Sequence, residues 1–170
     1  MLRKYYALWL LLAGVLGFVL GITLKTAWEE SKFIIGEWEQ DPILVVCPDS
    51  QLTNYRIEKA VEWWGIRNYN IAYIHWDHNN QICKNKWSQG MILIRSEGEL
   101  LPNTYAITSR LTILNKMVSA QIIIPNEHKF MPRLLEHELG HAFGMRHVEK
   151  LGHMMHPIHE NGGEMFWIPD

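Results

Sequence analysis

The chain opens with a long apolar segment. From Tyr5 to Leu24 there are 20 residues without a charged side chain, preceded by Arg3-Lys4. A helix of that length rises about 30 Å, the thickness of the hydrocarbon core of a bilayer. The segment therefore predicts a transmembrane signal-anchor helix within residues 1–24, and the basic pair places the rest of the chain outside the cytoplasm. The alternative is a cleaved signal peptide, which would release a secreted protein.

After this segment, residues 25–40 alternate between polar and aromatic side chains, and we interpret them as a tether. Two later segments carry apolar residues at helical spacing. The first has possible N-caps at Asp49 and Ser50 and ends at Gly65. The second begins at Pro132, because proline suits the first helical position, and continues to about Phe143.

Five further segments are short and rich in β-branched or aromatic residues, which is typical of strands. They lie at residues 42–48, 69–76, 91–94, 105–113 and 117–124. The resulting order is β-α-β-β-β-β-α, followed by irregular chain. This order predicts a mixed α/β domain over residues 41–170, with a five-stranded mixed sheet and two main helices.

Composition and charge limit the classes of function that this chain can have. A chain of 170 residues with 48% hydrophobic residues has room for one folded domain. A net charge of −2 and a pI near 6.5 argue against nucleic-acid binding. Two cysteines, Cys47 and Cys83, would form one disulfide in an oxidising exterior or remain as two buried thiols, and the sequence leaves both alternatives open.

Histidine is the unusual residue, because seven of the nine histidines fall in the last third of the chain. His137 and His141 are four residues apart on the predicted second helix, so both imidazoles can reach one metal ion. Glu138 is the next residue around that helix and can serve as a general base beside the metal. Gly144 allows the helix to end in a sharp reversal, after which His147 can return as a third ligand.

Three histidine ligands leave a fourth tetrahedral position for water, which is the arrangement of a catalytic zinc site. The whole segment, His137-Glu138-x-x-His141-x-x-Gly144-x-x-His147, resembles the zinc signature of the metzincin metallopeptidases. A methionine turn also resembles theirs: Met155 lies eight residues after His147, as in the matrixin branch, with Met154 as the fallback.

The resemblance covers roughly residues 41–160 and implies a zinc metallopeptidase, a hydrolase that cleaves peptide bonds in a protein or peptide substrate. It implies one zinc ion (Zn2+) held by His137, His141 and His147, and a bound water whose proton Glu138 accepts. Met155 would pack beneath the ligands. A sheet-edge strand within residues 104–124 would hold the extended substrate by main-chain pairing.

The sequence departs from the matrixin pattern in two places. His156 stands where matrixins usually have tyrosine, and the few residues after Pro157 leave little room for a C-terminal helix. The regular spacing of His153, His156 and His159 suggests either a second metal site or polar loop residues lining the cleft. Glu136 is interpreted as a charge on the helix surface.

Three alternatives to a general peptidase remain. The first is a catalytically silent, metzincin-like adaptor that keeps zinc and is tethered to a membrane. The second is a hydrolase of the same chemistry acting on a different substrate, such as a cell-wall peptide crosslink. The third is a structural zinc site, which would need a fourth protein ligand. Substrate, cleavage preference, regulation and oligomeric state are not predicted from this sequence.

Overall fold

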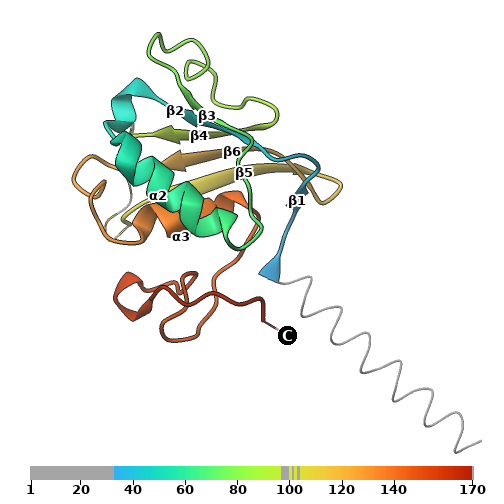
Figure 1. Cartoon of the computed structure of the whole chain (residues 1–170), viewed down its shortest axis with the longest axis vertical. Coiled ribbons are helices and arrows are strands. Elements are labelled where there is room, and N and C mark those ends of the chain that lie inside the picture. The colour runs from blue at the N-terminus through green and yellow to red at the C-terminus, as the bar shows by residue number, and fades with distance from the viewer. Residues whose placement is uncertain (1–32, 97–99, 101, 103, 170) are drawn as a thin grey trace, which may run out of the picture.

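The computed structural model describes residues 33–96, 100, 102 and 104–169 (Figure 1). The predicted transmembrane segment and the first part of the predicted tether lie outside these residues. In the part of the chain that is described, no helix combines the length and the apolar character needed to cross a bilayer.

A single six-stranded sheet forms the upper half of the molecule in Figure 1. The strands follow the order β1-β6-β4-β2-β3 with parallel pairing, and β5 pairs antiparallel with β6. Their bounds are Glu37–Trp38 (β1), Ile43–Val46 (β2), Ile74–Trp76 (β3), Met91–Arg95 (β4), Ile107–Ile113 (β5) and Lys116–Ile123 (β6).

The mixed α/β architecture is as predicted, but the expected count of five strands was wrong. The additional strand, β1, lies in the segment interpreted as a tether, and it pairs with β6 at Glu37↔Lys116 and Trp38↔Met117. Two residues are too few to show a period-2 pattern, so only pairing in the folded state defines this strand. The strand predicted at 69–76 is also shorter than expected and begins at Ile74.

Two helices, α2 (Asn54–Gly65) and α3 (Leu134–Ala142), pack side by side on one face of the sheet (Figure 1). The N-cap of α2 is Thr53, whose hydroxyl accepts the N–H of Arg56 at 3.3 Å. The predicted caps Asp49 and Ser50 instead lie in a preceding 3-10 turn, η1 (Pro48–Ser50). The second helix begins at Leu134, two residues after Pro132, because the intervening Arg133 has a positive φ of 63°.

The sheet has a core on each face, since alternate residues of a strand point to opposite sides. The larger core lies under the helices and includes Leu44, Ile92 and Leu139, all fully buried. The smaller core contains Val45 and Leu93 and is covered by the loop after β3.

A disulfide between Cys47 and Cys83 ties this covering loop to the sheet, so of the two alternatives for the cysteines the structure has the disulfide. The carboxylate of Asp77 also orders the loop by accepting the N–H groups of Gln81, Ile82 and Cys83 at 2.8–3.0 Å.

The chain after α3 contains one short 3-10 turn, η2 (His159–Asn161), and otherwise runs in irregular conformation below the helices in Figure 1. It returns to the core through Phe166, whose ring makes edge contacts with Trp63, Trp64 and Tyr69. Phe166 therefore packs the end of the C-terminal segment against α2.

Candidate metal centre

Helix α3 places His137 and His141 one turn apart, with ring centroids separated by 4.7 Å. The chain then reverses at Gly144, where φ is +98°, and returns with His147. A Cβ at Gly144 would also collide with the carbonyl oxygen of Gly36. Glycine is therefore required at position 144 by the backbone conformation and by the close approach of Gly36, the residue before β1.

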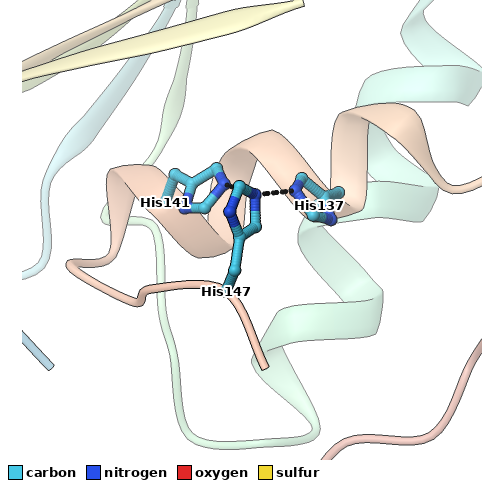
Figure 2. Close-up of side chains that lie close together, drawn as sticks. All are labelled: His137, His141 and His147. Atoms are coloured by element: carbon cyan, nitrogen blue, oxygen red, sulfur yellow. Dashed lines mark hydrogen bonds between the residues drawn. The ribbon is translucent and has the colours of Figure 1, made fainter. Parts of the chain in front are cut away.

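The three imidazoles point toward one another through their Nε2 atoms (Figure 2). The Nε2 of His147 lies 3.3 Å from that of His137 and 3.1 Å from that of His141. Nitrogen ligands about 2.0–2.1 Å from a tetrahedral zinc ion would lie about 3.3 Å from one another. The two distances from His147 match this requirement, all three ligand atoms lie within 4.8 Å of one another, and the three histidines could hold a metal ion.

The opposite nitrogen of two rings is held by the backbone. Nδ1 of His137 lies 2.8 Å from the carbonyl oxygen of Met154, and Nδ1 of His141 lies 2.9 Å from that of Met145. A carbonyl can only accept, so each Nδ1 carries the proton and each Nε2 presents a lone pair to a metal. The segments that carry Met154 and Met145 therefore set the orientation of both rings.

Desolvation favours the neutral form of all three imidazoles, of which His147 is the most exposed. It lowers the pKa of His137 to about 4 and that of His141 to about 3, and it also lowers the pKa of His147. The neutral form is the one that binds metals, so the protein environment favours the ligand state at neutral pH.

Glu138 lies beside the cluster and is 5% exposed. Its Oε2 accepts the hydroxyl of Thr108, a β5 residue, at 2.5 Å. Burial raises the pKa of Glu138 to about 7, opposed by the Thr108 hydrogen bond and by the positive charge of Arg110. Near neutral pH the carboxyl group therefore populates both its protonated and its ionised form. A general acid–base group needs a pKa close to the working pH.

The methionine pair lies directly behind α3. Both side chains are buried, Met154 at 3% and Met155 at 0% exposure. The sulfur of Met155 occupies the space that a Cβ on Gly140 would fill. The carbonyl of Met155 accepts the N–H of Val148, so this turn supports the segment carrying His147 as well as the ring of His137.

Two residues that the sequence analysis missed act on the ligand segment from β5. Besides Thr108, Arg110 donates through Nη1 to the carbonyl oxygens of His141 at 3.1 Å and Met145 at 2.9 Å. These residues are two apart in a strand, so they share the face toward α3. The alternation of side chains along a strand was predictable from the sequence. It did not show which helix or strand this face of β5 would pack against.

Glu136 is not the surface charge that was predicted. Its side chain is buried and forms a two-point ion pair with Arg56 of α2, at 2.5 and 2.7 Å. The indole of Trp64 donates to the carbonyl of the same residue at 2.8 Å. These contacts fix α3 against α2 immediately before the first ligand.

The later histidines do not form a second cluster. Among the described residues, only His137, His141 and His147 gather as a possible metal-binding group. His153 is fully buried; its Nδ1 accepts the N–H of Met155 and its Nε2 lies 3.0 Å from the carbonyl of Trp167. His156 and His159 line the cavity beside the cluster, as the loop alternative predicted, whereas His153 lines neither cavity at the cluster.

Two cavities flank the cluster, of about 380 Å³ and 580 Å³, and both are lined by Ala106, Glu138 and His147. The segment leading into β5 lines the smaller cavity and β5 itself lines the larger one. In the described part of the chain, β5 pairs with β6 on one side only. One edge of β5 is therefore free among the described strands, and its residues Thr108 and Arg110 contact α3.

Comparison with models of known protein families gives no match for this chain, and no curated protein is significantly similar to it.

Proposed function

We propose that this chain is a zinc-dependent endopeptidase of the metzincin type. The observation that carries the proposal is the convergence of three imidazole Nε2 atoms beside a buried glutamate. Three ligands of one kind, with no fourth in the cluster that the described residues form, suit a catalytic zinc better than a structural one. This argues against the structural-zinc alternative.

His137, His141 and His147 would hold the zinc ion. A zinc ion bound there supplies Lewis-acid chemistry, polarising a carbonyl group and acidifying water. Glu138 accepts a proton from the attacking water and delivers it to the departing amine. The Thr108 hydroxyl holds Oε2 of Glu138 in place, which leaves Oε1 for the proton transfer.

The substrate would be an extended peptide that pairs with the free edge of β5. An exposed antiparallel edge offers unpaired N–H and C=O groups to a peptide main chain. Ala106, Thr108 and Arg110 alternate along this segment toward the cluster, so a peptide on this edge would pass the metal centre. The disulfide supports an exterior location, either anchored by the predicted N-terminal helix or secreted.

The test uses the purified full chain as wild type, Glu138→Ala and His147→Ala. We expect the wild type to bind one zinc ion per chain and to cleave a broad peptide library. Glu138→Ala should retain zinc and lose roughly 10²–10⁴-fold in cleavage rate, because the proton acceptor is gone. His147→Ala should lose zinc. Zinc content and cut sites are measured by mass spectrometry on the same samples.

Two results would decide against the peptidase. Undiminished cleavage by Glu138→Ala would remove the role of that residue. Zinc binding by the wild type without cleavage of any peptide would favour the silent adaptor or a hydrolase with a different substrate.

A further inference from the structure

The two cavities beside the metal centre are two halves of one cleft. They share Ala106, Glu138 and His147, so the same three residues border both halves. A peptide held across the centre would place side chains on opposite sides of the reacting bond into different halves. The charges that line each half therefore bear on which side chains are accepted.

The smaller half is lined by the carboxylate of Glu160 in addition to Glu138. Glu160 lies there, with its Oε1 3.4 Å from the hydroxyl of Tyr105. None of the residues that line this half is a lysine or arginine. Leu134 and Ile158 supply apolar wall. Apolar wall beside a carboxylate suits the long aliphatic stem and charged head of a lysine or arginine side chain.

The larger half has the opposite charge. Arg110 and Arg146 both line it, and its one carboxylate is Glu138, which belongs equally to the other half. Arg110 is partly buried, and the neighbouring charge of Arg146 adds to burial in lowering its pKa. Two guanidinium groups that repel each other favour an anion between them.

These charges have no ion-pair partners elsewhere in the described chain. The two ion pairs formed by described residues are Arg56–Glu136 and Lys59–Glu62, neither of which involves Glu160, Arg110 or Arg146. A metal ion at the cluster adds the same positive charge to both halves. The difference between the halves therefore remains when the centre is loaded.

We propose that the cleft selects extended peptides that carry a basic side chain on the Glu160 side of the metal centre and an acidic side chain on the Arg110–Arg146 side. This selectivity rests on the proposed function only because it takes a peptide as the ligand. The charge difference itself comes from the described side chains.

The experiment measures binding rather than turnover. The full chain carrying Glu138→Gln and loaded with zinc is titrated against four fluorescent peptides with one shared apolar sequence. In the first peptide, lysine precedes and aspartate follows the middle of the apolar sequence, and the second peptide has the reverse order. The third peptide carries lysine at both positions, and the fourth carries no charge there. We expect one opposite-charge order to bind roughly fivefold to tenfold more tightly than the other three.

Charge reversals identify the residues. Glu160→Lys should remove the preference, and adding Arg146→Glu should transfer it to the reversed peptide. Glu58→Lys, at an exposed position of α2 that lines neither cavity, is the matched control and should change nothing.

Equal affinity for all four peptides, or no binding of any, would overturn the inference. So would a preference that survives Glu160→Lys. A charge preference in binding combined with no cleavage by the wild type would support the inference and reject the peptidase, so the two proposals fail separately.

Discussion

At the scale of single residues, each candidate ligand ring of α3 is oriented by a carbonyl from a different part of the chain. Met154 holds His137, and Met145 holds His141. Arg110 then donates to the carbonyls of both His141 and Met145, so it joins the last turn of α3 to the reversal at Gly144. One guanidinium therefore stabilises the geometry between the second and third ligands.

Arg110→Met should weaken zinc binding by roughly tenfold to a hundredfold, because supporting contacts behind metal ligands typically contribute that much. The side chain keeps its approximate length and loses both hydrogen bonds. Zinc affinity is measured by competition with a chromogenic chelator. Arg67→Met is the matched control, because Arg67 also donates to a carbonyl, that of Trp63, but far from α3's ligands in sequence. Equal zinc affinities of Arg110→Met and the wild type would contradict this role.

The histidine cluster could be predicted from the sequence, whereas the residues that hold it in place could not. His137, His141 and His147 were predictable because helical spacing and one glycine fix their relative positions locally. Thr108 and Arg110 were not, because their contacts with α3 join residues about 30 positions apart. Such contacts depend on how β5 lies against the helix, which no local pattern records.

At the scale of elements, Gly140 governs the packing of α3. A Cβ there would overlap the sulfur of Met155 and come within 2.8 Å of Cζ2 of Trp64. The methionine turn and α2 can therefore both approach α3 because this position has no side chain. Glycine costs a helix interior about 1 kcal/mol relative to alanine, so close packing must outweigh that cost.

Gly140→Ala should lower the free energy of unfolding by about 1–2 kcal/mol. Overpacking costs about 1–3 kcal/mol, and the gain in helix propensity offsets part of it. Urea unfolding measures the change. Gly65→Ala is the control, since a Cβ at Gly65 meets nothing within 4 Å and should leave stability unchanged or slightly raised. If the two substitutions shift the unfolding midpoint alike, the packing argument fails.

Helix and strand identities were largely predictable, while their ends were not. The apolar runs of β2 and β4 are near-continuous because both faces of these central strands are buried. The ends depend on single interactions. Thr53 caps α2 in place of Asp49 or Ser50, and the positive φ of Arg133 delays α3. Several residues near each helix start satisfy the same capping chemistry, so the sequence could not choose among them.

At the scale of the whole molecule, the sheet separates two regions. The helices and the candidate metal centre lie on one face, with Leu44 and Ile92 beneath them. The disulfide-bonded loop lies on the other, over Val45 and Leu93. No ligand histidine contributes to the second core. Stability of the loop and binding at the centre should therefore be separable.

The variant Cys47→Ser/Cys83→Ser tests that separation. The disulfide closes a loop with a sequence separation of 36, so its removal should lower the free energy of unfolding by about 3–4 kcal/mol in the chain-entropy account. Below the unfolding transition, zinc content should stay at the wild-type level, because the sheet lies between the loop and α3. Asp77→Ala is a second disruption of the same loop, because it removes the carboxylate that accepts three backbone N–H groups. If either variant remains folded by circular dichroism yet loses zinc, the two faces of the sheet are coupled, and loop stability and metal binding are not separable.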